Sequence, residues 1–178
     1  MDQTKLESEL ATFPLCGYAF LSPGEVPFSE RVRTVCRSEC PMYGKSWSCP
    51  PAVGSVSDCE ARCRGFSGCL LIASVAEVAD SADLSQTLPT RAPHMRMIRE
   101  IRQLLLDAGA SEVYALSAES CTLCESCTYP DAPCRNPDAM LPCVESHGIL
   151  VTALAESHGI DFLTESGTVI WFSLLFYR

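Results

Sequence analysis

Three short apolar runs along the chain predict the strands of a buried core. They lie at residues 70–75, 113–116 and 169–177, and they are rich in aliphatic and aromatic residues. Continuous runs of this kind suit strands that are covered on both faces, since strands buried on one face alternate apolar and polar positions. The last run is too short to span a membrane as a helix. We therefore expect three strands from these segments.

A periodic stripe of apolar residues between the first two runs predicts a helix. From residue 97 to residue 108, apolar side chains recur at steps of three and four, arginines fill the other face, and Gly109 follows as a C-terminal stop. Proline is tolerated in a first helical turn, so the helix is expected to begin near residues 90–93. The acidic and polar stretch 77–93 is then a connection.

The other segments carry weaker patterns. Residues 14–69 hold seven cysteines among Pro, Gly and Ser, which predicts a loop-rich, metal-organised half. Asn136-Pro137 marks a candidate helix start. The pentapeptide Glu-Ser-His-Gly-Ile occurs at 145–149 and again at 156–160. We interpret its histidine as a last-turn residue that favours the helix macrodipole and its glycine as a left-handed cap, in preference to a metal pair.

Strands and helices that alternate after residue 69 predict the fold class. We expect one domain over residues 1–178, an α/β or α+β sandwich with a mixed sheet. The cysteine-rich half, 14–69, is expected to wrap over one end of a core formed by 70–178.

Composition and charge exclude several classes of partner. Among 178 residues, 47% are hydrophobic and 20% charged, as in globular proteins, and the net charge is −9 with only two lysines. Negative charge repels phosphate backbones and anionic lipids, so neither nucleic acid nor a membrane surface is an expected partner. The first residues lack the basic segment of a secretory signal, which favours the cytoplasm.

Twelve cysteines are the strongest chemical feature. They are Cys16, Cys36, Cys40, Cys49, Cys59, Cys63, Cys69, Cys121, Cys124, Cys127, Cys134 and Cys143. An even number is compatible with disulfides, but disulfides need an oxidising compartment. In a reduced compartment, cysteines in such number are more often metal ligands.

A C-x2-C-x2-C run, formed by Cys121, Cys124 and Cys127, is the clearest local motif. Three thiolates within seven residues can converge on one cubane while backbone amides face its sulfides, and bacterial ferredoxins use this run. There, a fourth cysteine follows after three residues and ligates the other cluster. Here Cys134 follows after six residues, which makes it a candidate local fourth ligand. Structural zinc usually takes two separated pairs, so an iron–sulfur cluster is favoured over zinc.

A second motif has the spacing C-x3-C-x8-C and comprises Cys36, Cys40 and Cys49. Prolines after the second and third cysteines rigidify the loop. The fourth ligand is open: the candidates are Cys16, Cys59, Cys63 and Cys69, or a group outside the chain. Cys143 is a possible additional ligand that is assigned to neither motif. That vacancy matters, because a cluster with four cysteines mainly moves electrons whereas an iron with an open position can bind substrate as a Lewis acid.

These two motifs together resemble a known family, the predicted metal-binding proteins grouped as domain of unknown function 2284. Three segments match. The first is Cys-x3-Cys-Pro-x-Tyr-Gly-Lys-x-Trp-x-Cys-Pro-Pro at 36–51, and the second is the C-x2-C-x2-C run followed by Pro-Cys-Arg-x-Pro at 133–137. The third is Glu-x-x-Gly-Ile at 145–149. The resemblance covers most of the chain. It implies iron–sulfur or other metal binding in anaerobic microbes and no settled reaction. Cys143 stands where the family is expected to carry serine.

Two basic residues and three aromatic ones lie inside the motifs. Lys45 and Arg135 are candidates for tuning a cluster or facing an anionic substrate, although a solvated loop lysine is an equally good interpretation of Lys45. Tyr43, Trp47 and Tyr129 are interpreted as aromatics that shield the site from solvent.

Three functions are compatible with these features. The first is electron transfer to a partner enzyme by a protein with two [4Fe-4S] clusters. The second is an enzyme, of the lyase or desulfidase type, in which a three-cysteine cluster binds a small-molecule substrate at an open iron. The third is an interaction module organised by zinc.

Overall fold

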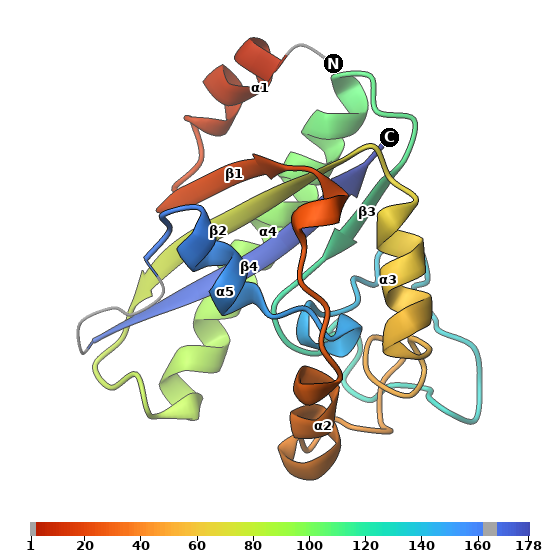
Figure 1. Ribbon diagram of the computed structural model, residues 1–178. Coiled ribbons are helices and arrows are strands. Elements are labelled where there is room, and N and C mark those ends of the chain that lie inside the picture. The colour runs from red at the N-terminus through yellow and green to blue at the C-terminus, as the bar shows by residue number, and fades with distance from the viewer. Residues whose placement is uncertain (1–2, 162–166) are drawn as a thin grey trace.

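A four-stranded antiparallel sheet forms the centre of the described chain (Figure 1). The computed structural model describes residues 3–161 and 167–178. The strands are β1 (Gly17–Leu21), β2 (Gly68–Glu77), β3 (Val113–Leu116) and β4 (Thr168–Tyr177), in the spatial order β1-β2-β4-β3. In the register, Leu71 of β2 and Leu116 of β3 both face Leu174 of β4. All three predicted strands are confirmed.

Helices cover both faces of this sheet. They are α1 (Gln3–Leu10), α2 (Glu30–Glu39), α3 (Val56–Arg64), α4 (Leu84–Asp107) and α5 (Val151–Ser157), with short 3₁₀ turns η1 (Pro23–Glu25) and η2 (Glu145–His147). Figure 1 shows α4 behind the sheet and α5 in front of it. The α+β expectation is confirmed, but the sheet is antiparallel throughout the described residues and not mixed.

Each face of the sheet has its own apolar core, because alternate residues of a strand point to opposite faces. Leu70 and Ile72 of β2 pack with α1 and with the apolar stripe of α4. Leu71 and Ala73 point the other way and pack with Leu154 of α5 and with residues near α3. β2 is therefore buried on both faces, which explains its uninterrupted apolar sequence.

Helix α4 begins earlier than its sequence pattern predicts. Asp83 accepts a hydrogen bond from the backbone N–H of Ser85 and caps the helix, which then runs from Leu84 through Pro89 and Pro93. Residues 84–93 of the predicted connection therefore form the first turns of α4, and only residues 78–83 connect β2 to it. Gly109 follows the helix with a φ of 101°, as expected of a stop. No described helix is both long and apolar enough to cross a bilayer.

Three other local predictions are corrected. The cysteine-rich half is not mainly loop, since β1, α2 and α3 lie within it, each helix starting at a serine cap. No helix follows Asn136; the chain there makes turns. His147 does not serve the macrodipole, because it is buried and its pKa falls to about 3 through desolvation. Its ring instead hydrogen-bonds the Tyr114 hydroxyl at 2.7 Å.

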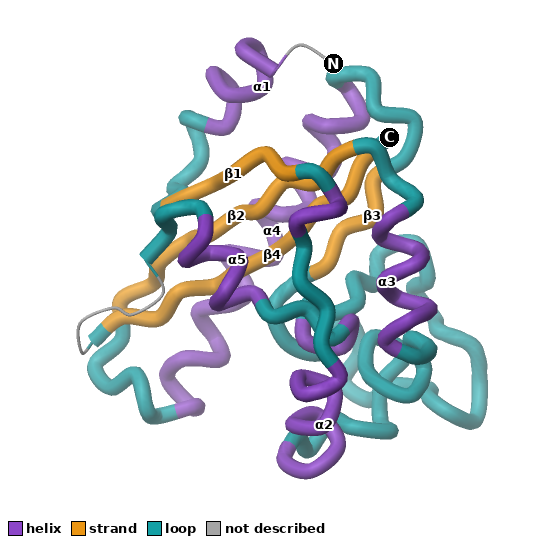
Figure 2. The backbone as a smooth tube through the Cα atoms, viewed as in Figure 1, coloured by secondary structure: helices purple, strands orange, loops and turns teal. Residues whose placement is uncertain are grey.

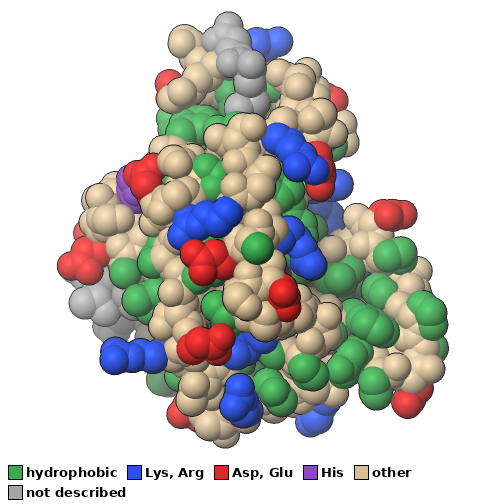
Figure 3. Space-filling model, turned by 45° about the vertical axis from the view of Figure 1, so that its right-hand side comes forward, with side chains coloured by type: hydrophobic (Ala, Val, Ile, Leu, Met, Phe, Trp, Pro, Cys, Tyr) green, Lys and Arg blue, Asp and Glu red, His purple; other side chains and the backbone are tan. Residues whose placement is uncertain are grey.

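The long loops gather at one end of the sheet, beside α2 (Figure 2). They comprise residues 40–55, between α2 and α3, and residues 117–144, between β3 and η2. On the face shown in Figure 3, acidic and basic side chains are interspersed, and hydrophobic side chains gather on the lobe at the right. Both cysteine motifs lie in or next to these loops.

Candidate metal centre

The 117–144 loop leaves the sheet and returns to its starting point. Ser117, just beyond β3, forms a β-bridge with Cys143, and its N–H donates to the carbonyl of Pro142 at 2.8 Å. The chain between them is therefore a closed loop anchored on a strand end. The C-x2-C-x2-C run therefore lies in a loop that begins at the end of β3.

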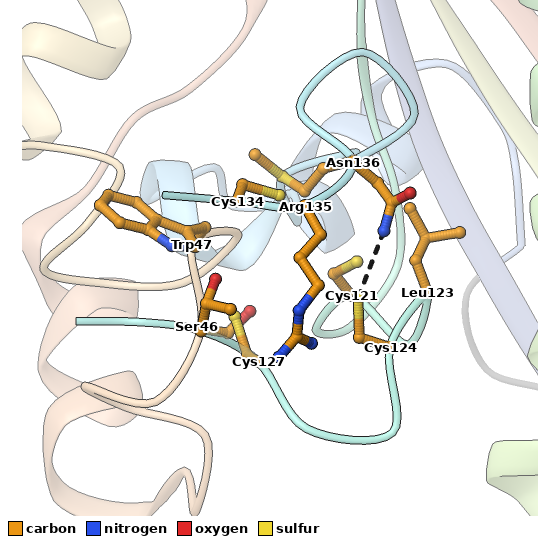
Figure 4. A pocket seen from close by; sticks show the side chains of 11 residues that line it. Ser46, Trp47, Cys121, Leu123, Cys124, Cys127, Cys134, Arg135 and Asn136 are labelled. Atoms are coloured by element: carbon orange, nitrogen blue, oxygen red, sulfur yellow. Dashed lines mark hydrogen bonds between the residues drawn. The ribbon is translucent and has the colours of Figure 1, made fainter. Parts of the chain in front are cut away.

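Four cysteines of this loop surround one cavity, here called site 1: Cys121, Cys124, Cys127 and Cys134. Figure 4 shows the four side chains around a common space with Arg135 extending across it. The Asn136 amide donates to Cys124 Sγ at 3.3 Å, and Arg135 Nη1 donates to the Ser126 carbonyl at 2.9 Å. The free space is about 20 Å³, room for about one water molecule. A cluster at site 1 therefore requires the exposed Arg135 side chain to swing outward.

The electrostatics of site 1 differ from one thiol to the next. Burial opposes ionisation of Cys127, but hydrogen bonds from the backbone N–H groups of Tyr129 and Trp47 outweigh it and lower its pKa. Burial raises the pKa of Cys121. The amides directed at Cys127 are the kind of environment that stabilises a bound thiolate.

A second cavity, here called site 2, is bordered by Cys36, Cys40, Cys49 and Cys143. Helix α2 supplies Cys36 and ends at Cys40, the 40–55 loop supplies Cys49, and the end of the 117–144 loop supplies Cys143. The cavity measures about 330 Å³. Cys143 thus borders the same cavity as the three cysteines of the C-x3-C-x8-C motif.

The thiols of site 2 perturb one another. A hydrogen bond with Cys143 lowers the pKa of Cys49 to about 7, while the same contact and burial raise that of Cys143. Burial and the neighbouring Cys40 raise the pKa of Cys36 to about 11. The ionisation of Cys49 and that of Cys143 therefore depend on each other. A bound cation would favour the thiolate form of all four thiols.

Two carboxylates complete the lining of site 2. Glu145 is half-buried with its Oε2 inside, and desolvation raises its pKa to about 7, with a further contribution from the charge of Glu119. Its Oε2 has no hydrogen-bond partner among the described residues. Glu119 adopts a φ of 61°, in the left-handed region that non-glycine residues seldom occupy. Sequence reasoning did not single out either glutamate for this site.

A buried pair of serines joins the two sites. Ser48 Oγ accepts the N–H of Cys121 at 2.9 Å and lies 3.6 Å from Cys49 Sγ, so one hydroxyl contacts a cysteine of each site. Ser46 Oγ lies 2.9 Å from Ser48 Oγ. The pattern of cysteines gave no sign of these serines, although both lie inside the C-x3-C-x8-C motif.

An aromatic contact holds the two loops together. The Trp47 indole N–H donates to the carbonyl of Ala132 at 3.1 Å, and its ring packs edge-on against Tyr129 with centroids 4.9 Å apart. Trp47 also borders site 1, while Tyr43 borders site 2. The interpretation of these residues as shielding aromatics agrees with their positions.

A protein-family model matches residues 19–177 of the chain, and its description is "Predicted metal-binding protein (DUF2284)". The match includes every cysteine of both sites. The chain belongs to this family. No curated protein and no solved structure matches it significantly. Metal binding is thus the property that the DUF2284 family and the two cysteine-lined cavities have in common, and the family description specifies neither the metal nor a reaction.

The remaining cysteines of this DUF2284 protein lie away from both cavities. Cys59, Cys63 and Cys69 are buried, the last two within the core on the α3 side of the sheet, and Cys16 is exposed beside β1. Cys59 and Cys63 both lie on α3, and Cys59 donates to the carbonyl of Val53 at 3.4 Å. All twelve cysteines fall in the described ranges, and all are free thiols.

Of the two basic candidates, one borders a cysteine site and the other does not. Arg135 extends across site 1, whereas Lys45 is exposed and lines neither site, which agrees with the solvated interpretation. Within residues 3–161 and 167–178, no three His, Cys, Asp or Glu side chains converge on a point suited to a single ion. The thiols of each site surround a space and do not meet at its centre.

Proposed function

We propose that this DUF2284 protein holds two [4Fe-4S] clusters and transfers electrons to a partner enzyme. One cluster is assigned to site 1, on Cys121, Cys124, Cys127 and Cys134. The other is assigned to site 2, on Cys36, Cys40, Cys49 and Cys143. The observation that carries the proposal is that four cysteines border each of two adjacent cavities.

The donor sets favour clusters over zinc ions. Four thiolates are the ligands of a [4Fe-4S] cluster, and a C-x2-C-x2-C run is typical of ferredoxins. Four thiolates on one zinc ion lie about 3.8 Å apart, given Zn–S bonds of about 2.3 Å. The site 2 cavity, at about 330 Å³, offers more space between its thiols than one ion fills.

The fourth cysteine at each site favours a carrier over a catalyst. A bound cluster would supply one-electron oxidation and reduction. An open iron requires a site with three protein ligands, whereas Cys134 and Cys143 each provide a fourth. Ser48 contacts both sites and is placed to keep their separation short. The net charge of −9 suits a partner with a basic docking surface.

The test is metal and sulfide analysis of protein purified without oxygen. We expect about eight irons and eight sulfides per chain, since each cluster holds four of each, together with an EPR signal on reduction. Cys143→Ala and Cys134→Ala should each lower the iron content towards four. Cys16→Ala, in which an exposed thiol outside both sites is removed, should keep eight.

Three results would contradict the proposal or one of its ligand assignments. Colourless protein with stoichiometric zinc would favour the zinc-organised interaction module. Eight irons together with a spectrum that changes on adding a small-molecule ligand at the cluster would favour the enzyme with an open iron. Full iron retention in Cys143→Ala would remove Cys143 from site 2.

A further inference from the structure

A groove of about 840 Å³ lies between helix α4 and both cysteine loops. The N-terminal half of α4 forms one wall, and Cys40 of site 2 and Cys121 of site 1 lie along the other. Its volume is within the range of pockets that bind small molecules, about 300–1,000 Å³. The groove is thus a ligand-sized space that borders both candidate metal sites.

The walls of the groove are largely apolar. Leu84 and Leu88 on α4 and Leu123 in the 117–144 loop line it, and all three are exposed. Water-exposed leucines that face one another across a concave surface are poorly explained by packing within the chain, because each would gain from being covered. These side chains can bury the apolar body of a bound molecule.

Positive charge is concentrated in this groove, although the chain as a whole is acidic. Arg91, Arg96 and Arg99 line it, and Glu119 is the one acidic residue among its described lining. The groove therefore carries a net positive charge in a chain of net charge −9. Apolar walls with a few convergent charges are the usual composition of a small-molecule site.

The three arginines are not equivalent. Arg91 is buried and donates to the Ser120 carbonyl at 3.0 Å and to Thr122 Oγ1 at 3.1 Å, so its guanidinium holds the loop against α4. Arg99 Nη1 donates to the Met95 carbonyl at 3.0 Å, within its own helix, and Nη2 donates to the Ala139 carbonyl at 3.5 Å. Arg96 is exposed and has no hydrogen-bonded or ion-paired partner in the described part of the chain. Arg96 and the remaining donors of Arg99 are available to a ligand.

We propose that the groove binds a small organic anion, a carboxylate or phosphate on an apolar body. The guanidinium groups of Arg96 and Arg99 hold the anionic group, for which their paired N–H donors are suited. Leu88 and Leu123 cover the apolar part. A molecule in this position lies against Cys40 and Cys121 at once, and so at the margin of both candidate metal sites. The assignment goes beyond electron transfer and does not depend on which metal the cysteines hold.

The experiment measures binding of simple probes to anaerobically purified protein by isothermal titration calorimetry. Octanoate and octyl phosphate supply the anionic group and the apolar body; octanol and octyltrimethylammonium supply the same body with no charge or with positive charge. We expect both anions to bind at least tenfold more tightly than the other two probes. Comparing the two anions shows whether the carboxylate or the phosphate is preferred.

Variants locate the binding in the groove. Arg96→Ala should weaken anion binding about tenfold or more, the loss of one charge-assisted contact, and Leu88→Ser should weaken it through loss of apolar cover. Arg31→Ala, which removes an exposed arginine on α2 outside the groove, should leave binding unchanged. The proposal would be overturned if Arg96→Ala left anion binding intact, or if the anionic and cationic probes bound equally well. It would also be overturned if no probe bound while a partner protein shielded Arg96 from solvent.

Metal analysis of the same samples separates the two proposals. If the anions bind but iron and sulfide are absent, the groove assignment stands and the cluster assignment fails. If eight irons are present and no anion binds, the groove assignment alone fails. Arg96→Ala should keep the metal content of the unsubstituted protein, since Arg96 touches neither cysteine set.

Discussion

His94 shows how a single buried residue of this protein responds to its surroundings. It lies on the inner face of α4, and its two ring nitrogens are 2.7 Å from Ser74 Oγ of β2 and 2.8 Å from Ser173 Oγ of β4. Burial lowers its pKa to about 4. Both nitrogens are satisfied by hydroxyls, so the neutral ring joins α4 to two central strands without an unpaired polar group. His94 is a structural residue and not a metal ligand.

The pKa of His94 predicts a pH dependence of stability. An unfolded histidine titrates near pH 6.5, so between about pH 6.5 and pH 4 the unfolded chain binds a proton that folded His94 does not. The free energy of unfolding therefore falls as the pH drops through this window, by about 2 kcal/mol from this residue between pH 7.5 and 5. Urea denaturation of His94→Gln at both pH values should show a shallower pH dependence by that amount.

Glu145 raises the free energy of unfolding as the pH falls, opposite to His94. Its folded pKa lies above its unfolded value, so protonation favours the folded state. Comparing His94→Gln with the unsubstituted protein cancels this contribution. His158→Gln, at a partly exposed histidine near Glu25, is the control and should keep the full slope. An unchanged slope in His94→Gln would show that His94 does not cause the pH dependence.

At the scale of elements, helix α2 has one buried side chain, that of Arg33. Arg33 Nη1 donates to the Gly54 carbonyl at 2.8 Å, and Nη2 donates to the Ser146 carbonyl within η2. The same helix carries Cys36 and ends at Cys40. Arg33 thus connects α2 to both segments that supply the other cysteines of site 2.

Substitution of Arg33 should affect stability and site 2 together. Arg33→Met leaves two buried carbonyls without donors, each at a cost of about 1–3 kcal/mol, so we expect a loss of about 2–4 kcal/mol in the free energy of unfolding. Displacement of α2 should also remove the metal bound at site 2 and leave the metal at site 1 in place. Urea denaturation and metal analysis measure the two effects.

Arg31→Met removes an exposed arginine of the same helix and should change neither quantity. Arg33→Lys, which keeps the charge but not the forked donors, should fall between the two variants. Full metal content together with full stability in Arg33→Met would mean that α2 is held by other contacts.

At the scale of the whole molecule, the apolar cores and the candidate metal sites occupy different regions. The two cores flank the sheet and include Cys63 and Cys69, but none of the eight cysteines of sites 1 and 2. The cysteine loops lie at one end and contain turns in place of regular hydrogen-bonded structure (Figure 2). We infer that the sheet and its helices are stable without metal, whereas the loops depend on it.

Metal removal should therefore expose the loops to protease and leave the sheet intact. Lys45 and Arg135 are exposed basic residues, one in each loop, so trypsin should cleave after both in chelator-treated protein and much more slowly before treatment. Far-UV circular dichroism should keep most of its amplitude. Arg102, which lies within α4, is the internal control and should resist cleavage in both samples. Loss of the far-UV signal on metal removal would show that metal holds the whole fold.

The sequence determined those features that depend on local or strongly periodic patterns. The three apolar runs became β2, β3 and β4 because uninterrupted apolar stretches can only be buried on both faces of a sheet. The six cysteines of the two motifs, together with Cys134, border two cavities, since close spacing in the chain holds thiols together wherever the loop lies. Family membership likewise followed from these motifs. Helices α2 and α3 were missed, because their apolar faces are short and their serine caps stand among loop-like residues.

Tertiary structure decided what depends on residues distant in the chain. Cys143 joins Cys36 at site 2 although more than a hundred residues separate them, because the 117–144 loop returns to Ser117 beside the end of β3. Ser48 contacts both sites only because the two loops pack against each other. Spacing along the chain cannot encode such meetings, since they are set by how the strands pair and where the loops close.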